Sequence, residues 1–250
     1  MSEHVTKQVD GKPFGKVAVG IRCGDRGCDP VTLKCWTRLI AAELREGDKV
    51  IPPAVELPHH WAANLLAHLF LTETDCDTLL MIDDDMTWQP GTLAAMRDNR
   101  DNWTCGIVQG LCCSRKSGHG PLLLAENGAY YSPIMPEAGD GTLEVGMVGL
   151  AFTLIRRSAF KAVEAQRRPG CMFFAWGSGG TGEDAWFCKL ARKGGVRIGV
   201  DTTATIGHRV PIAVHWDLEK QSPGYHTYRN QPFLDLLGAV QNEQDAKQED

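Results

Sequence analysis

The stretch LLMIDDDMT, residues 79–87, decides the fold that we expect. Four apolar residues run directly into three carboxylates, the pattern of a buried central strand whose C-terminal end emerges into a site. Residues two apart in a strand project to the same side, so Asp83 and Asp85 can converge on one ligand while Asp84 points away. Such carboxylates suit Mg²⁺ or Mn²⁺, with a diphosphate filling further coordination positions. A solvated acidic loop is the alternative interpretation.

The composition of the chain is that of an ordinary globular protein. At 250 residues it can bury a full core as one large domain. With 43% hydrophobic and 23% charged residues, neither a fibrous nor a wholly disordered chain is expected. A net charge of -5 argues against wide, sequence-independent binding to nucleic acid, although it is compatible with a local basic groove.

The cysteines and the N-terminal stretch bear on the cellular compartment. The nine cysteines are odd in number and form no C-x-x-C pair, so we expect reduced thiols rather than disulfides or a structural zinc site. Residues 1–15 have no apolar core and predict a flexible lead-in. We therefore expect no signal peptide, no membrane anchor and a cytoplasmic location.

Two strand and helix pairs precede the acids. Residues 16–22, KVAVGIR, alternate like a first strand, and Asp29 and Pro30 then supply the N-cap and the first turn of a helix. The loop between them contains Asp25 and Arg26. These two side chains can approach a nucleotide, or they can simply flank a turn.

The second pair is less regular. Residues 50–57 predict a strand interrupted by two prolines, which favours an edge position or an early end. Residues 60–71 predict a helix with Trp61 and Leu65 on one face. Asn64 of this helix can hydrogen-bond a base or a ribose, or it can be an ordinary surface residue.

The chain after the acids predicts more strands. Residues 104–113 form one of them, with Gly110 at a point of close backbone approach. Arg115 lies just past its end and can hold a phosphate or sugar oxygen. Residues 122–131 and 143–148 predict a hairpin or lid over the sheet.

A second group of acids lies in WGSGGTGEDAWFCKLARK, residues 176–193. Thr181 and Asp184, three residues apart, form a capping-box pattern at a helix start. Glu183 and Asp184 then lie in the first helical turn, beside a glycine-rich loop, where a substrate hydroxyl can reach them. Helix capping alone is the alternative role for these acids.

Two further patterns concern the second half of the chain. Arg156 and Arg157 begin a basic run, which predicts a solvated face. His208 follows a short predicted strand at 197–200. Its imidazole can complete an octahedral metal site with a carboxylate and phosphates, or it can be purely structural.

The order of these motifs, an apolar strand with DDD, a Gly-Glu-Asp helix start and a late His208, resembles the GT-A glycosyltransferases, especially the family 2-like group. The resemblance spans about residues 16–216, although each motif is short. It implies that Asp85 and His208 bind the metal. It also implies that Asp83 contacts the ribose of the nucleotide, and we expect Asp83 to lie at the metal as well.

The segment WGSGGTGED resembles the W-G-x-G-E-D signature of galactosyltransferase-type members of that family. The resemblance implies that Asp184 is the catalytic base and that Glu183 contacts the acceptor. Asp25 and Arg26 match the family's loop residues for the base only loosely. The nucleotide-sugar contacts that we expect, besides Asp83, are Asp84, Asp25, Arg26, Asn64 and Arg115.

The expected fold class is α/β and GT-A-like (Rossmann-like), with a mixed, mostly parallel sheet flanked by helices and a small lid region. We expect one catalytic domain over residues 16–240 and a disordered tail over 241–250. Within the domain, residues 16–115 would form the nucleotide-sugar-binding half and residues 116–240 the acceptor and catalytic half.

The resemblance implies a metal-dependent glycosyltransferase that moves a sugar from a nucleoside diphosphate sugar to an acceptor hydroxyl. Mn²⁺ or Mg²⁺ would be the cofactor, and single displacement with inversion, with Asp184 as base, the mechanism. The acceptor is left open among a saccharide, a lipid-linked intermediate, a protein and a hydroxylated nucleic-acid base.

Two alternatives remain. IDDDMT also fits the D-x-D-x-T signature of haloacid-dehalogenase-like phosphatases, in which Asp83 would be the nucleophile and Asp85 the general acid. That motif normally lies on the first strand of its domain, and His208 would then have no role. The third interpretation is a nucleotide-sugar-binding protein that has kept the fold without activity.

Overall fold

The computed structural model describes residues 11–24, 27–113, 123–127, 130–137, 141–177, 181–209, 212–217 and 222–227. The chain divides into two compact units, Met1–His208 and Arg209–Asp250. The first unit contains every element up to β11. In the second, β12 (Ile212–Asp217) and β13 (Ser222–Thr227) pair as an antiparallel hairpin.

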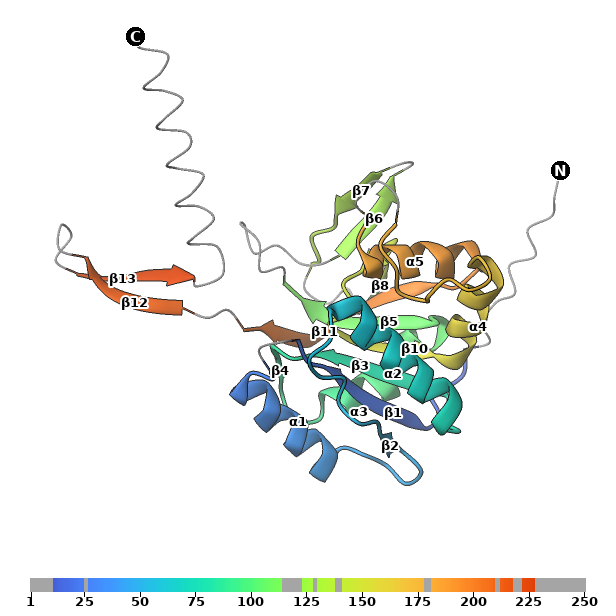
Figure 1. Ribbon diagram of the computed structural model, residues 1–250, viewed down its shortest axis with the longest axis horizontal. Helices are drawn as coiled ribbons and strands as arrows, with labels where there is room; N and C mark the ends of the chain where they lie inside the picture. Colours follow the sequence, from blue (N-terminus) through green and yellow to red (C-terminus); the bar gives the residue numbers. More distant parts are fainter. Residues whose placement is uncertain are drawn as a thin grey trace, which may run out of the picture. The chain divides into compact units, whose positions relative to one another are not determined.

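The first unit is built on one mixed sheet (Figure 1). Its strands run in the order β2-β1-β3-β10-β5-β11-β4, and β8 pairs with β11. Their bounds are β1 Val17–Arg22, β2 Lys49–Val50, β3 Thr78–Asp83, β4 Met86–Trp88, β5 Ile107–Cys112, β8 Thr142–Glu144, β10 Phe152–Arg156 and β11 Ile198–His208. The pairs β1·β2, β1·β3 and β5·β11 are parallel, whereas β10 is antiparallel to both of its neighbours.

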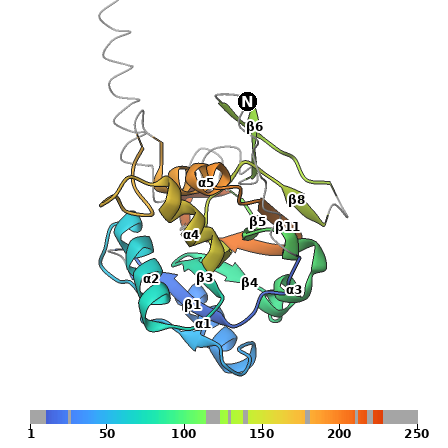
Figure 2. The ribbon, with the colours of Figure 1, turned by 90° about the vertical axis from the view of Figure 1, so that its right-hand side faces the viewer.

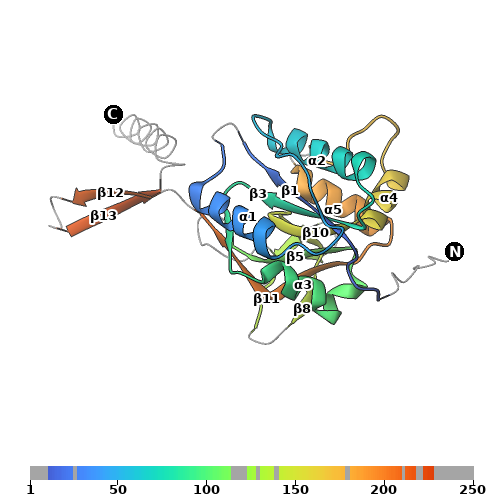
Figure 3. The ribbon, with the colours of Figure 1, turned by 90° about the horizontal axis from the view of Figure 1, so that it is seen from below.

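Helices cover both faces of this sheet (Figure 2). One face is covered by α2 (His59–Glu73), α4 (Arg157–Gln166) and α5 (Glu183–Lys193). The other face is covered by α1 (Pro30–Ala42) and α3 (Thr92–Asp98) (Figure 3). A 3₁₀ helix at Arg100–Thr104 follows α3. In β3, Leu79 and Met81 join the first layer, while Leu80 and Ile82 join the second. Burial on both sides explains why β3 is a continuous apolar run instead of an alternating one.

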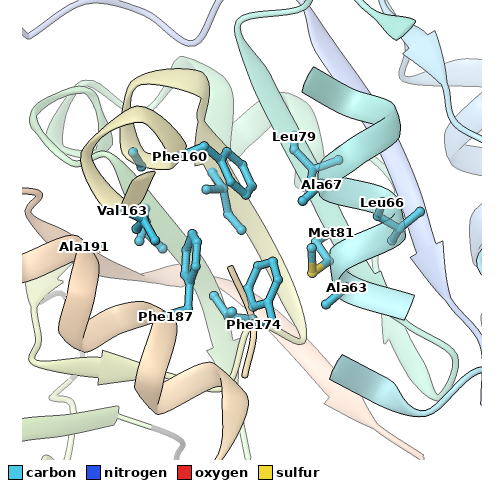
Figure 4. Packing of buried hydrophobic residues seen from close by; sticks show 14 of the residues in the cluster. Ala63, Leu66, Ala67, Leu79, Met81, Phe160, Val163, Phe174, Phe187 and Ala191 are labelled. Carbon is cyan, nitrogen blue, oxygen red and sulfur yellow. The ribbon is translucent and has the colours of Figure 1, made fainter. Parts of the chain in front are cut away.

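An aromatic cluster fixes α5 against its neighbours (Figure 4). The rings of Phe174 and Phe187 stack with centroids 4.4 Å apart, and Phe160 of α4 lies 5.4 Å from Phe187. Ala63 and Ala67 of α2 belong to the same cluster. Because α5 carries two candidate acids in its first turn, this packing sets where those acids lie.

Helix α1 starts as predicted. The Asp29 side chain accepts hydrogen bonds from the backbone N–H groups of Val31 (2.8 Å) and Thr32 (3.4 Å), and Pro30 is the first helical residue. These bonds satisfy two of the N–H groups that a helix start leaves without an intrahelical partner.

Helix α2 buries a different face from the one predicted from Trp61 and Leu65. Trp61 is 48% exposed and Leu65 is 37% exposed, whereas the small Ala62 and Ala63 are buried beside Leu66. Small residues allow the helix to approach β1 closely. At the contact, a Cβ on Gly20 would lie 2.9 Å from a methyl carbon of Leu66.

The two less regular predictions are corrected in part. The strand expected over residues 50–57 is short and lies at the sheet edge, because only Lys49–Val50 pair with β1 as a strand. The hairpin expected over 122–131 and 143–148 becomes a three-stranded sheet of β7 (Tyr130–Pro133), β6 (Leu123–Asn127) and β9 (Met147–Val148). Thr142–Glu144 leaves that hairpin and joins β11 of the main sheet instead.

The prediction of a solvated basic face is wrong for Arg156 and Arg157. The Arg156 side chain donates to the carbonyl oxygens of Lys12 (2.5 Å) and Cys105 (3.0 Å). Arg157 donates to carbonyl oxygens at and beyond the end of α2, including that of Phe70 at 2.9 Å. These guanidinium groups satisfy backbone acceptors that have no strand or helix partner, which a charge pattern alone does not reveal.

Further predictions concern the cysteines, Gly110, membrane-spanning helices and the chain ends. All nine cysteines are free thiols, as expected. A Cβ on Gly110 would lie 2.6 Å from a side-chain carbon of Ile206, which confirms the close approach predicted there. In the part of the chain that the structure describes, no helix is long and apolar enough to cross a membrane. Of the flexible lead-in expected over residues 1–15, residues 1–10 lie outside the described residues, whereas Phe14 is buried in the core at 3% exposure. The tail over 241–250 also lies outside the described residues.

Candidate functional site

A cleft of about 680 Å³ opens where several strands and two helix starts meet. Strand β3 contributes Asp83, β1 ends there with Arg22, and His208 is the last residue of β11. The other lining residues come from the start of α2, the β9–β10 connection and the start of α5: Pro58, His59, His60, Met147, Gly149, Ala151, Trp176, Gly182, Glu183, Asp184 and Ala185. Open α/β sheets bind ligands at such carboxyl ends of strands.

Arg22 and Asp83 form a buried ion pair at the floor of the cleft. The two residues are directly opposite each other in the parallel β1·β3 ladder. The Arg22 Nε lies 2.6 Å from Asp83 Oδ1, and the side chains are 2% and 15% exposed, respectively. Burial alone would lower the pKa of the guanidinium, but attraction to Asp83 and Asp184 outweighs it and raises that pKa. Arg22 therefore remains positively charged.

Asp184 faces the same guanidinium from the other side of the cleft. It lies in the first turn of α5, with Oδ1 3.5 Å from Arg22 Nη1, and its side chain is 24% exposed. Burial raises the pKa of Asp184 to about 7, against the pull of Arg22 and with added repulsion from Glu183 and Asp83. A carboxyl group with this pKa can accept a proton near neutral pH.

The start of α5 differs from the prediction in one detail. The N-cap residue is Gly182, and no side chain caps the helix, so the capping box expected from Thr181 and Asp184 is wrong. The helix ends at Gly194 as predicted. The Asp184 carboxylate lies 3.5 Å from Arg22 Nη1 and lines the cleft.

Asp83 is perturbed by the same environment. Burial raises its pKa, while Arg22 and His59 oppose that increase. The Asp83 backbone N–H donates to the Ala151 carbonyl at 2.9 Å, which ties the end of β3 to the loop before β10.

Asp84 points away from the cleft toward the loop between β1 and α1. Its carboxylate accepts from the Gly24 N–H at 2.8 Å, and its carbonyl accepts from the Asp29 N–H, also at 2.8 Å. Asp84 thus ties Gly24 and Asp29 to the end of β3. Its own predicted contact with a nucleotide sugar stays a prediction.

His208 reaches Asp85 because β11 is long. The strand runs along β5, shifts its register between Asp201 and Thr205, and then pairs with β4, where His208 lies opposite Met86. The His208 Nε2 lies 3.4 Å from Asp85 Oδ1, with side chains 11% and 13% exposed. The other ring nitrogen, Nδ1, lies 2.8 Å from the Cys113 carbonyl oxygen.

This arrangement fits a divalent cation. A carbonyl oxygen is an acceptor only, so Nδ1 of a neutral His208 carries the proton, and the Nε2 lone pair then faces a carboxylate oxygen. Within the described part of the chain, Nε2 is buried and has no hydrogen-bond partner. Two ligands on one Mg²⁺ or Mn²⁺ at about 2.1 Å from it would lie about 3 Å apart, close to the observed separation. Among the residues described, no group of three or more His, Cys, Asp or Glu side chains gathers around a common point, so substrate and water would supply the other positions.

Asn64 lies behind the cleft instead of lining it. Its side-chain amide donates to the Phe174 carbonyl at 2.7 Å and accepts from the Phe174 N–H at 3.2 Å. These bonds fasten the segment that leads to Trp176 onto α2. The predicted contact of Asn64 with a base or ribose stays untested, and Asp25, Arg26 and Arg115 lie outside the described residues.

Among the cleft residues that were not singled out from the sequence, three are of note for polar or aromatic side chains suited to a ligand site. The first is Arg22, whose signal is a charged residue at the end of an otherwise apolar strand. The second is His59, which precedes the predicted helix start by one residue. The third is Trp176, which is 63% exposed and opens the glycine-rich motif. Exposed aromatic residues beside polar groups are common in ligand sites.

Comparison with known proteins gives a likeness in fold. No family model matches the chain, and no curated protein matches it. Among solved structures, the crystal structure of A197 from STIV matches with a TM-score of 0.56 and 18% identity, over 86% of this chain and 97% of that one. The crystal structure of S. aureus TarS 1–349 in complex with UDP-GlcNAc matches with a TM-score of 0.46 and 11% identity, over 78% of this chain and 59% of that one. The chain therefore shares the fold of A197, and the predicted α/β, GT-A-like fold class is confirmed.

Proposed function

We propose that this protein is a metal-dependent glycosyltransferase that moves a sugar from a nucleoside diphosphate sugar to an acceptor hydroxyl with inversion. The observation that carries the proposal is the Asp184 carboxyl, which has a pKa of about 7 and lines a cleft together with Asp83 and His208. A general base works best when its pKa lies near the operating pH.

In the proposed reaction, Asp184 accepts the proton of the acceptor hydroxyl while that oxygen attacks the anomeric carbon. The new glycosidic bond forms as the bond between the anomeric carbon and the diphosphate oxygen breaks, and the nucleoside diphosphate leaves with the electron pair. Attack from the face opposite the leaving group inverts the anomeric centre. Glu183, next to the base, would accept a hydrogen bond from the acceptor.

Asp83 and its neighbours form the proposed donor side. The end of a central strand is the usual place for a nucleotide in open α/β sheets. One oxygen of Asp83 bonds to Arg22, and the side chain is 15% exposed, so a ribose hydroxyl can donate to the carboxylate from the cleft. Asp85 and His208 would hold Mn²⁺ or Mg²⁺, whose positive charge stabilises the negative charge on the leaving diphosphate.

The phosphatase alternative has less support. It needs the D-x-D-x-T acids on the first strand of the domain, whereas β3 follows β1, α1, β2 and α2. It also needs Asp83 as a nucleophile, although Oδ1 of Asp83 bonds to Arg22 at 2.6 Å. Release of phosphate from p-nitrophenyl phosphate would favour this alternative.

The test is an assay of nucleoside diphosphate release from a panel of donor sugars with Mn²⁺, Mg²⁺ or EDTA. We expect metal-dependent release from one donor, and a loss of about 10²- to 10⁴-fold in Asp184→Asn. The variant should keep the rise in Tm that donor and metal produce in the wild type, because Asp184 acts on the acceptor. Asp98→Asn is the matched control, since Asp98 is a surface carboxylate with a side chain 63% exposed.

Three outcomes would count against the proposal. Near-normal turnover in Asp184→Asn would remove this residue as the base. No shift in Tm with any donor and metal would remove the donor site itself, and a shift without turnover by the wild type would favour an inactive binding protein.

A further inference from the structure

The Arg22 side chain bonds to three separate segments of the described chain that line the cleft. Its guanidinium contacts Asp83 at the end of β3, Asp184 at the start of α5 and the carbonyl of Leu150 before β10. The residue is 1% exposed. A planar guanidinium with donors in a fixed fork holds several acceptors at set angles, which a lysine ammonium cannot do.

The third contact lies at a strained point of the backbone. Leu150 has a φ of 54°, in the left-handed region that residues other than glycine seldom adopt. Its carbonyl accepts from Arg22 Nη2 at 3.4 Å. On the next residue, the Ala151 N–H donates to the buried Gln109 side chain at 3.3 Å. Such strain persists only where the surrounding contacts hold it, and it is concentrated at functional sites.

The distances to the two acids are unequal. Arg22 lies 2.6 Å from Asp83 but 3.5 Å from Asp184. The strong pair keeps Arg22 in place beside the donor acid, whereas the weaker contact orients Asp184 without binding it so tightly that it cannot accept a proton. Other titratable groups that line the cleft near Asp184 are Glu183 on α5, His59 and His60 on α2, and His208 on β11, with Cys188 buried one turn along α5.

We propose that Arg22 is a positioning residue that fixes Asp184 relative to Asp83, and thereby aligns the acceptor side of the cleft with the donor side. The assignment of the two sides rests on the proposed function. Arg22 itself does not touch the reacting atoms. It acts through Asp184, whose orientation decides whether the acceptor oxygen is directed at the anomeric carbon, and a misplacement of about 1 Å can cost about 10²-fold in rate.

The test uses Arg22→Lys and Arg22→Gln in the full chain, with Arg97→Lys as the matched control. Arg97 is also a buried arginine, 5% exposed and 2.6 Å from Asp48, but it lies on α3 and does not line the cleft. We expect Arg22→Lys to reduce kcat by at least about 30-fold while donor KM changes by less than about 3-fold. Arg97→Lys should change neither beyond its effect on the folded fraction.

A second readout does not depend on turnover. Carbon-13 NMR of labelled aspartate carboxyl groups, assigned with Asp184→Asn, reports the titration of Asp184 directly. Because Arg22 favours the charged form of Asp184, Arg22→Gln should move the titration midpoint upward by at least about one pH unit. Arg97→Lys should leave it near the wild-type value of about 7.

The two readouts separate this inference from the proposed function. If the wild type transfers no sugar but the Asp184 midpoint moves in Arg22→Gln, the proposed function fails while the hold of Arg22 on Asp184 stands. An unchanged midpoint in Arg22→Gln would overturn the positioning role. So would a kcat loss in Arg22→Lys no larger than in Arg97→Lys. If Arg22→Gln does not fold, the comparison of the two lysine variants decides.

Discussion

Two of the three acids at the end of β3 and just after it lie near a basic side chain, but the two partners differ in kind. Asp83 is 2.6 Å from the guanidinium of Arg22, which is buried and always charged. Asp85 is 3.4 Å from Nε2 of His208, whose other nitrogen already bonds to a backbone carbonyl. The charges of Asp83 and Arg22 neutralise each other within the chain. Asp85 and His208 instead place two atoms that could bind a metal close to each other.

This difference indicates what each pair is suited to do. A buried carboxylate needs a positive partner. Removing that partner lowers the free energy of unfolding by more than the intact pair contributes to it. Arg22 meets the need of Asp83 permanently, so this pair can serve as a rigid reference point for the cleft. Asp85 and His208 instead place a carboxylate oxygen and a ring nitrogen 3.4 Å apart, which suits two ligands of one Mn²⁺ or Mg²⁺.

The largest expected effect comes from breaking the first pair. Arg22→Leu leaves Asp83 and Asp184 buried without their shared cation, and we expect a loss of about 3–5 kcal/mol in the free energy of unfolding at pH 8. Urea unfolding measures it. Arg45→Leu, which breaks the exposed pair with Asp98, should cost less than about 1 kcal/mol. A similar small loss in both variants would contradict the account of the first pair.

A smaller effect of opposite sign is expected at Asp184. Its folded-state pKa of about 7 lies above the ordinary value of 3.8, so the folded protein binds more protons between these values. The free energy of unfolding should therefore fall as the pH rises through this window, and the full penalty applies above pH 7. Asp184→Asn removes it, and we expect a gain of about 1–3 kcal/mol at pH 8.

Urea unfolding of wild type and Asp184→Asn at pH 5, 6, 7 and 8 checks this prediction. The gain should shrink toward pH 5, where wild-type Asp184 is protonated. Asp83 keeps its raised pKa in both proteins and contributes a slope to both. A constant difference at all four pH values would show that Asp184 does not titrate in the predicted range.

The smallest effect on stability is expected in the pair of Asp85 and His208. Added metal should make the difference between this pair and the pair of Arg22 and Asp83 measurable. Without metal, His208→Gln should change the free energy of unfolding by less than about 1 kcal/mol, because it exchanges one polar side chain for another outside the apolar core. With Mn²⁺ the wild type should gain stability that the variant lacks. His68→Gln on the exposed face of α2 is the control. An equal Mn²⁺ effect in His208→Gln and the wild type would remove His208 from the metal site.

The sequence alone determined features that depend on neighbouring residues. The apolar run before Asp83 predicted a strand buried on both faces, and Asp29 with Pro30 predicted the start of α1. These succeed because strand burial and helix capping are decided by side chains only a few positions apart. The capping box at Thr181 failed because the N-cap is Gly182, one residue later, and Asp184 faces Arg22 from a distant strand.

Only the tertiary structure decided how the site is assembled. Arg22 and Asp184 are 162 positions apart, and they meet because β1 lies beside β3 while α5 packs across the same end of the sheet. His208 meets Asp85 because β11 shifts register and continues along β4. Likewise, α2 buries its alanines and leaves Trp61 exposed because the backbone of Gly20 admits a close approach. Sequence patterns predict which residues carry charge or apolar surface. The pairing of strands and the packing of helices determine which of these residues face one another, because those contacts join parts of the chain that share no local pattern.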